Sequence, residues 1–160
     1  MKTKPSFLII DVDGVMTTGQ FIYSNIGKIY KIFGPHDADG LNLLKKKIKI
    51  LFVSADRRGF NISKKRIQDD LGYNLKFSHH DTRFKFIKKL GFDNVIYIGD
   101  GIHDVSLLKK VRMGIAPKNA RIEAKKASNY VTRSNSGDGA VLDAAIKINN
   151  TFFSKNKKKS

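Results

Sequence analysis

Four short runs of apolar residues constrain the fold of this chain most strongly, because each run is continuous rather than alternating. They occupy residues 7–10, 50–53, 95–98 and 113–116. Continuous apolarity is what a strand needs when both faces of its sheet are covered by helices. Stretches with helical spacing separate the runs, at about residues 38–47, 60–71, 82–90, 102–110, 118–127 and 138–149. The alternation predicts an α/β fold that is doubly wound around a mostly parallel sheet.

One exception to this alternation follows the first apolar run. Residues 20–33 contain two runs with strand-like alternation around Asn25 and Gly27, which favours a β-hairpin inserted after the first strand. The chain has no internal repeat and no long linker, and 160 residues fit a single domain. We expect that domain to span residues 1–150, with a basic and mobile C-terminal tail over residues 151–160.

Polar side chains follow three of the apolar runs at the point where each predicted strand ends. Asp11 and Asp13 follow the first run, Ser54 follows the second, and Asp100 follows the third, with Asp104 four residues later. In sheets of this kind, ligands bind at the carboxyl ends of the strands. A single aspartate at such a position is often only a helix cap, and this alternative stays open for Asp104.

Carboxylates at the ends of separate strands repel one another unless a cation lies among them. Asp11 and Asp13 are two residues apart, which in an extended segment places both carboxylates on the same side. With Asp100 they form an all-oxygen ligand set without histidine or cysteine, which favours Mg²⁺ over zinc. The sequence therefore predicts a magnesium site formed by Asp11, Asp13 and Asp100.

A metal ion flanked by carboxylates and a hydroxyl group suits phosphoryl transfer, in which catalysis is mostly positioning and charge neutralisation. One aspartate can attack phosphorus and form an aspartyl-phosphate that water then hydrolyses. The second aspartate can protonate the departing alcohol and later take a proton from that water. Gly14 supports this interpretation, because glycine lets the backbone turn sharply and approach a phosphate closely.

The charge of the chain is strongly positive, with 31 Lys and Arg against 14 Asp and Glu, a net charge of +17. Such a charge suggests an anionic partner, although a Lys-rich composition alone would also produce it. A nucleic-acid-binding protein, or a non-catalytic scaffold with a basic surface, is therefore the alternative to an enzyme. The chain lacks an aromatic-interleaved platform, helix-turn-helix spacing and zinc ligands, so we expect no nucleic acid as partner.

The absence of cysteine excludes disulfides, thiolate metal sites and cysteine nucleophiles, and it indicates a cytoplasmic protein. Asp11 and Asp13 interrupt the N-terminal apolar run well before it could form a signal peptide or a membrane span. We therefore expect no membrane partner.

The three motifs together resemble the haloacid dehalogenase superfamily of Mg²⁺-dependent phosphatases. They are DVDGVMTTG at 11–19, Ser54 after the second run, and GDGIHD at 99–104. Further stretches, at 20–33, 33–44, 125–132 and 136–145, are similar to the small phosphatases without a cap domain that are typified by 3-deoxy-D-manno-octulosonate (KDO) 8-phosphate phosphatase. The resemblance implies a Rossmann-like three-layer sandwich without a cap.

The resemblance also implies roles for the strand-end residues. Asp11 would be the nucleophile and a Mg²⁺ ligand, and Asp13 the general acid and base that lends its main-chain carbonyl to the metal. Asp100 would complete the metal site, and Asp104 would order its surroundings. Ser54 would hydrogen-bond a phosphoryl oxygen.

The superfamily places a cation, usually lysine, at the start of the helix before the last motif. Alignment on Leu90 puts Arg83 at that position, with Lys85 as the rival. Arginine keeps the positive charge but is planar and forked, so the geometry would differ from that of lysine.

The departures from the family concern the substrate end. Residues 54–59 replace a Thr-Gly-Arg-like stretch, residues 36–38 replace Arg-Asp-Gly, and Leu142-Asp143 replaces Arg-Glu. We expect a phosphorylated keto sugar acid, similar to KDO 8-phosphate or to a nonulosonate 9-phosphate. The candidate substrate-binding residues are Gly14, His36, Asp37, Ala55, Arg57, Arg58 and Lys85. For Arg57 and Arg58, solvated surface is an equal alternative.

Two further expectations concern the histidines and the assembly. His79, His80 and Asp81 invite a metal site, but Asp81 is also a natural helix cap, and His103 is expected to pack or to be solvated. The apolar hairpin would be a liability on a monomer, and in the resembled family four subunits associate through it while a neighbour's tail covers the site. We therefore expect a homotetramer.

Overall fold

The computed structural model describes residues 4–154 and contains a six-stranded parallel sheet in the order β5-β4-β1-β6-β7-β8. The strands are β1 (Phe7–Asp11), β4 (Lys49–Ser54), β5 (Asn74–Phe77), β6 (Val95–Ile98), β7 (Met113–Ala116) and β8 (Tyr130–Val131). The four apolar runs form the four central strands, so the predicted parallel α/β sheet is confirmed. The edge strands β5 and β8 were not predicted, because they are short and only partly buried.

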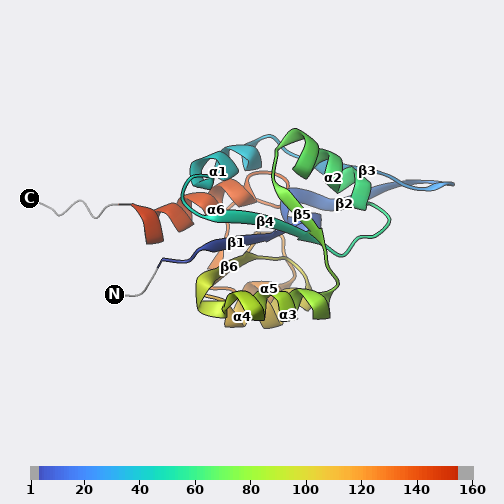
Figure 1. Ribbon diagram of the computed structural model, residues 1–160. Coiled ribbons are helices and arrows are strands. Elements are labelled where there is room, and N and C mark those ends of the chain that lie inside the picture. The colour runs from blue at the N-terminus through green and yellow to red at the C-terminus, as the bar shows by residue number, and fades with distance from the viewer. Residues whose placement is uncertain (1–3, 155–160) are drawn as a thin grey trace, which may run out of the picture.

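Helices cover both faces of the sheet, as the prediction of a three-layer fold requires (Figure 1). Helices α1, α2 and α6 lie on one side, and α3, α4 and α5 lie on the other. Their bounds are His36–Leu44 for α1, Phe60–Lys64 for α2, His80–Leu90 for α3, Val105–Lys110 for α4, Ile122–Ala127 for α5 and Ala140–Ile148 for α6. Short helical turns extend α2 over Lys65–Asp70 and precede α4 over Ile102–Asp104.

The two apolar cores explain why the strands are continuously apolar. Leu8 and Ile10 of β1 belong to the core under α1 and α6, whereas Ile9 between them belongs to the core under α3 and α4. All three side chains are fully buried. Because successive side chains of a strand point to opposite faces, a central strand covered on both sides has no position for a polar residue.

Strand order brings the predicted site residues together. β1 pairs with β4 on one side and with β6 on the other, with Asp11 opposite Val53 and Ile10 opposite Ile98. The polar residues at the carboxyl ends of these three strands therefore lie close together. At this position the strand order of the sheet reverses direction, which is the usual place for a ligand in a doubly wound sheet.

The predicted hairpin is present and projects from the body of the protein (Figure 1). It consists of β2 (Thr17–Ser24) and β3 (Gly27–Phe33), which are antiparallel. Six large apolar side chains on it are exposed, up to 87% for Ile26; the others are Phe21, Ile22, Tyr23, Tyr30 and Ile32. Within residues 4–154, no cap domain is inserted after this hairpin or elsewhere.

The C-terminal part of the described chain continues beyond the expected domain boundary at residue 150. A helical turn over Asn149–Phe153 follows α6, and Phe152 and Phe153 pack against the larger core. The rest of the expected tail, residues 155–160, lies outside the described residues. None of the helices within residues 4–154 combines the length and the apolarity that a membrane crossing requires.

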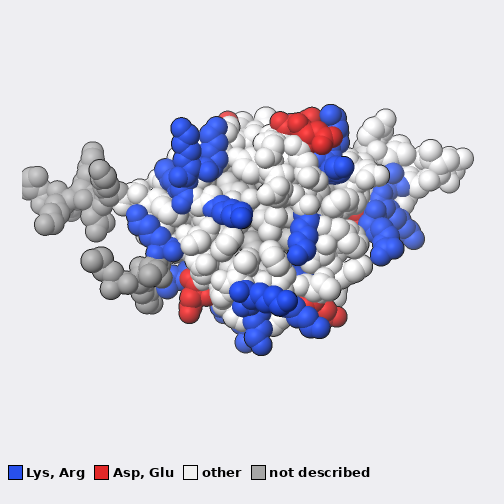
Figure 2. Space-filling view, viewed as in Figure 1, with Lys and Arg blue, Asp and Glu red and all other residues white. Residues whose placement is uncertain are grey.

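Lysine and arginine side chains on the face shown in Figure 2 occur in several separate groups, with acidic groups between some of them. They do not form one continuous stripe there. This face therefore does not favour the nucleic-acid-binding alternative, which needs a connected basic surface.

Candidate active site

The turn after β1 positions the first two aspartates. Asp11 is the last residue of β1, and the chain then turns through Val12–Met16, with Gly14 at a φ of 82°. A Cβ atom on Gly14 would collide with the carboxylate of Asp100. Glycine is thus required twice at this position, for its backbone conformation and for the close approach of Asp100.

Three carboxylates gather at the ends of β1 and β6. Asp11, Asp100 and Asp104 each place an oxygen atom within 4.8 Å of the others. This side-chain set includes Asp104 and not Asp13, for which the resemblance implies a ligand through the main-chain carbonyl. The carboxylate of Asp13 points instead toward Ser54 and Lys31.

The three carboxylates of this cluster repel one another when they are ionised, and a bound cation would relieve this repulsion. Burial raises the pKa of Asp11 well above its usual range, and although Arg83 opposes the shift, Asp104, Asp100 and Asp13 add to it. Burial and the neighbouring Asp104 raise the pKa of Asp100 to about 7. Carboxylates whose charged forms are disfavoured in this way fit a divalent cation, which would neutralise their repulsion.

Arg83 of α3 is the cation that faces the cluster. Its side chain is 2% exposed, and Nη2 lies 3.2 Å from Asp11 Oδ1. Nη1 donates hydrogen bonds to the hydroxyl of Tyr97 at 2.8 Å and to Asp104 Oδ1 at 3.2 Å. Burial disfavours the charge, but Asp11, Tyr97 and Asp104 raise the pKa of Arg83 above its usual value. Lys85, the rival, is exposed on the same helix and does not line the site.

Asp104 is bound on both oxygens and holds the loop after β6. Oδ2 accepts hydrogen bonds from the backbone N–H groups of Asp100 at 3.1 Å and Gly101 at 3.0 Å. The Tyr97 hydroxyl donates to Oδ1 and keeps its proton, because burial raises its pKa well above the usual value. Asp104 therefore orders the loop after β6 and also contacts Tyr97 and Arg83, so it does more than cap the following helical turn. Tyr97 was not predicted, since it lies within a continuous apolar run.

Asp13 is held by two donors on its carboxylate. The hydroxyl of Ser54 donates to Oδ2 at 3.2 Å, and Lys31 Nζ donates to the same oxygen at 3.0 Å. Lys31 lies on β3 of the hairpin and its side chain is fully buried. Sequence reasoning missed Lys31, because alternation in a hairpin does not say which face meets the rest of the protein.

A cavity of about 230 Å³ opens beside the first two aspartates. It is lined by Asp11, Asp13, Phe21, Lys28, Ala55, Asp56, His80 and Arg83. Of the seven candidate substrate-binding residues, only Ala55 lines it, while Gly14 packs beneath it against Asp100. Phe21, Lys28, Asp56 and His80 were not predicted to be there.

The interpretation of Asp37 as a substrate-binding residue needs a correction. Its carboxylate is fully buried and accepts hydrogen bonds from the backbone N–H groups of Val141 at 2.8 Å and Gly139 at 3.4 Å. Asp37 thus caps the first turn of α6, more than 100 residues away in the sequence. Burial raises the pKa of Asp37, which these hydrogen bonds partly offset. Neighbouring His36 is exposed.

Arg57 and Arg58 lie outside the cavity as well. Both are exposed, and the guanidinium of Arg57 lies over the ring of Phe77, 5.6 Å from its centroid. Their exposure agrees with the alternative that both arginines belong to the solvated surface.

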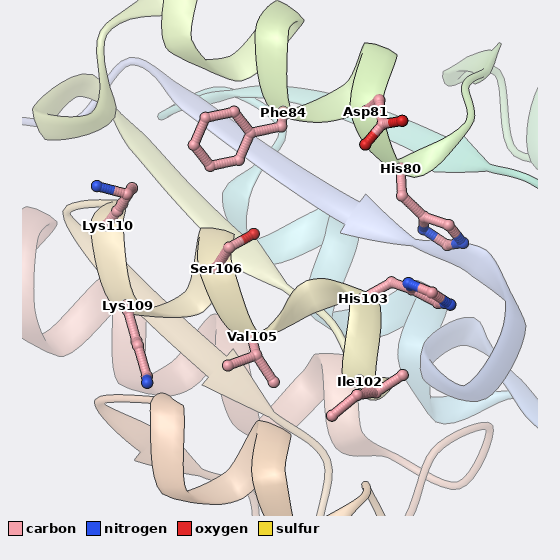
Figure 3. A pocket seen from close by; sticks show the side chains of 9 residues that line it. All are labelled: His80, Asp81, Phe84, Ile102, His103, Val105, Ser106, Lys109 and Lys110. Carbon is pink, nitrogen blue, oxygen red and sulfur yellow. The ribbon is translucent and has the colours of Figure 1, made fainter.

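The histidines pair differently from their order in the sequence. His80 stacks on His103 with ring centroids 3.9 Å apart, whereas His79 packs edge-on against Phe77. The stacked pair lies at one end of a hollow of about 790 Å³ between α3 and α4, with Lys109 and Lys110 toward its other end (Figure 3). Among the described residues, the histidines are not part of any group of three metal-ligating side chains.

Comparisons with known proteins agree with this geometry. The haloacid dehalogenase-like hydrolase family matches residues 85–144. The KDO 8-phosphate phosphatase of Haemophilus influenzae is 32% identical over 149 residues, which cover 89% of this chain and 81% of that protein. The corresponding phosphatase of Escherichia coli K12 is 28% identical and covers 85% of this chain and 74% of that protein.

Two solved structures share the fold. The cobalt-bound KDO 8-phosphate phosphatase of H. influenzae has a TM-score of 0.78 at 28% identity, covering 92% of this chain and 88% of that chain. The phosphatase of Moraxella catarrhalis, solved with magnesium, phosphate and KDO, has a TM-score of 0.77 at 26% identity, covering 91% of this chain and 86% of that chain. These similarities confirm the resemblance: the chain belongs to the haloacid dehalogenase superfamily of phosphatases, in the family of the KDO 8-phosphate phosphatases.

Proposed function

We propose that this chain is a Mg²⁺-dependent phosphomonoesterase that acts on a phosphorylated keto sugar acid, similar to KDO 8-phosphate or to a nonulosonate 9-phosphate. The observation that carries the proposal is the carboxylate cluster of Asp11, Asp100 and Asp104. A fourth aspartate, Asp13, lies beside this cluster and is held separately by Lys31. The relatives named above, with magnesium or cobalt bound in their structures, support the metal and the substrate class.

The side chains divide the reaction between them. Asp11 attacks phosphorus and forms an aspartyl-phosphate while the bond from phosphorus to the sugar oxygen breaks. Asp13 gives a proton to that oxygen, and then takes one from the water that hydrolyses the intermediate. Arg83, with Nη2 3.2 Å from Asp11 Oδ1, orients the nucleophile and supplies positive charge for the phosphoryl oxygens. The hydroxyl of Ser54, which the resemblance assigns to a phosphoryl oxygen, donates instead to Asp13. Mg²⁺, held by Asp11, Asp100 and the Asp13 carbonyl, supplies neutralisation of the phosphoryl charge when it is bound.

Phosphate release from a panel of phosphorylated keto sugar acids tests this proposal. We expect release with Mg²⁺ from at least one nine- or eight-carbon sugar acid phosphate, and complete loss in the presence of EDTA. Sugar phosphates without a carboxylate serve as controls. Release that is unaffected by EDTA, or release from none of the sugar acids, would contradict the proposal.

The affinity for Mg²⁺ is expected to fall with decreasing pH. Because the pKa of Asp100 is about 7 without metal, binding below pH 7 must first remove a proton, and the apparent Kd should rise about tenfold per pH unit there. The folded state holds this proton more tightly than the unfolded state, so the metal-free protein loses stability as pH rises from about 4 to 7. Thermal unfolding at pH 5, 6, 7 and 8, with and without Mg²⁺, measures both effects.

Asp100→Asn should remove most of the Mg²⁺-dependent rise in unfolding temperature and should stabilise the metal-free protein at pH 8. The matched control is Asp93→Asn, which changes an exposed carboxylate before β6 and should leave both quantities unchanged. A full Mg²⁺ response in Asp100→Asn would exclude Asp100 as a ligand.

We also propose that four copies of the chain associate through their hairpins. The large apolar side chains on β2, β3 and their turn support this, because they are exposed on a hairpin that projects from the body of the protein. Light scattering after size exclusion should give four times the mass of one chain. The double variant Ile22→Lys, Ile26→Lys should give a smaller mass, whereas Ile146→Lys on α6, which is as exposed as Ile22, should not. A wild-type mass of one chain would refute the proposal.

A further inference from the structure

The hairpin places a buried ammonium group beside Asp13. Lys31 Nζ lies 2.8 Å from Asp13 Oδ1, 2.8 Å from Asp56 Oδ2 and 2.8 Å from Ser63 Oγ, to which it donates. An ammonium group has three donors, and three acceptor groups surround this one. A buried lysine without partners would be strongly destabilising, so this site is built to hold the charge in one position.

The positive charge of Lys31 belongs to a group of two lysines and two carboxylates. Lys28, also on β3, donates to Asp56 Oδ2 at 2.6 Å. Two lysines of the hairpin therefore meet two carboxylates, one from the turn after β1 and one from the loop after β4. Burial disfavours ionised Asp56, but hydrogen bonds from Lys28 and Lys31 outweigh it and lower the pKa of Asp56. A Cβ atom on Gly59 would collide with Asp56 and Lys31, which shows how closely the loop packs here.

The two oxygens of Asp13 have different surroundings. Oδ2 accepts hydrogen bonds from both Lys31 and Ser54. Oδ1 is buried and close to Lys31 Nζ, but it accepts no well-aligned hydrogen bond from any described residue. Lys31 therefore contacts both oxygens of Asp13, at 2.8 Å from Oδ1 and 3.0 Å from Oδ2, and with Ser54 it fixes the carboxylate at the wall of the cavity.

We propose that Lys31 is a positioning residue for proton transfer, which together with Ser54 fixes the carboxylate of Asp13 beside the cavity, where the leaving oxygen of the substrate would lie. The proposal rests on the proposed function. Protonated Asp13 gives its proton to the leaving oxygen, which takes the electron pair of the breaking bond to phosphorus, while the bond from phosphorus to Asp11 forms. Lys31 neither gives nor receives a proton in this step.

A positioning role for the acid predicts a dependence on the leaving group. An alcohol leaves only with a proton, whereas 4-nitrophenol leaves readily as an anion. The test therefore compares two substrates of similar size: 4-nitrobenzyl phosphate, an alkyl ester, and 4-nitrophenyl phosphate, an aryl ester. The quantity is kcat/KM, because it reports the steps up to the departure of the alcohol or phenol.

Lys31→Met is expected to lower kcat/KM for the alkyl ester by about 100-fold, the size of the effect of a small misplacement of a catalytic group. For the aryl ester we expect a decrease within about threefold, since general acid catalysis contributes little there. Lys31→Arg should recover part of the activity toward the alkyl ester. Lys46→Met is the control, because Lys46 is an exposed lysine that does not line the cavity, and its substitution should leave both kcat/KM values unchanged.

Equal losses with both esters would overturn the proposal, since a purely structural lysine affects both substrates alike. If Lys31→Met is unfolded by circular dichroism, Lys31→Gln is measured in its place and decides in the same way. A failure of the proposed function is recognised separately, by a wild-type protein that hydrolyses neither ester with Mg²⁺. If the wild type is active and Lys31→Met leaves the ratio unchanged, only the role of Lys31 is refuted.

Discussion

Asp11→Asn is expected to lower kcat for phosphate release by about 10⁴-fold or more, with no loss of folded protein. An amide does not attack phosphorus, so the aspartyl-phosphate cannot form. The substitution keeps the shape of the side chain, and burial already disfavours the charge of Asp11. The unfolding temperature of the metal-free variant should therefore equal or exceed that of the wild type.

Phosphate release and thermal unfolding, measured on the same preparation, check this prediction. Asp81→Asn is the control, because Asp81 is an exposed carboxylate at the start of α3 and does not line the cavity beside Asp11. Activity that survives in Asp11→Asn would refute the covalent mechanism, even if the substrate class were correct.

Arg83→Met is expected to lower the free energy of unfolding by about 3 to 5 kcal/mol, the cost of removing one partner from a buried ion pair. Asp11 and Asp104 would lose their only buried cation within the described chain, and the hydroxyl of Tyr97 would lose a donor. Urea denaturation of the metal-free protein measures this effect.

Lys85→Met provides the comparison for Arg83→Met. Both residues lie on α3, but Lys85 is exposed, so its substitution should change the free energy of unfolding by less than about 0.5 kcal/mol. Similar effects of the two substitutions would contradict the network described around Arg83. The same pair decides which residue is the phosphate-site cation, since only Arg83→Met should reduce phosphate release.

Much of the site could be predicted because strand ends are easy to read. Asp11 and Ser54 directly follow continuous apolar runs, Asp100 follows a third run after Gly99, and these three runs become neighbouring strands. The choice between Arg83 and Lys85 could not be made in this way. Two residues that are two positions apart on one helix point in different directions, and an alignment shifted by two positions exchanges them.

Other contacts could not be predicted, because they join segments that are distant in the sequence. Asp37 caps α6 across more than 100 residues, and no local pattern reveals such a partner. Lys31 faces the body of the protein only because of how the hairpin folds back onto α2, where it meets Ser63. In the sequence, Tyr97 is indistinguishable from other core residues of a strand, and only the structure shows that its hydroxyl donates to Asp104. The sequence therefore showed which elements carry the chemistry, but not the contacts that orient them.

The hairpin joins two tasks in one ribbon, with Lys31 near its base and Ile26 at its tip. If neighbouring subunits hold the tip, they also restrain the strand that carries Lys31. Dilution would then change turnover as well as subunit mass, and specific activity toward alkyl esters should fall at protein concentrations at which the assembly dissociates. The specific activity of such an enzyme would depend on its own concentration.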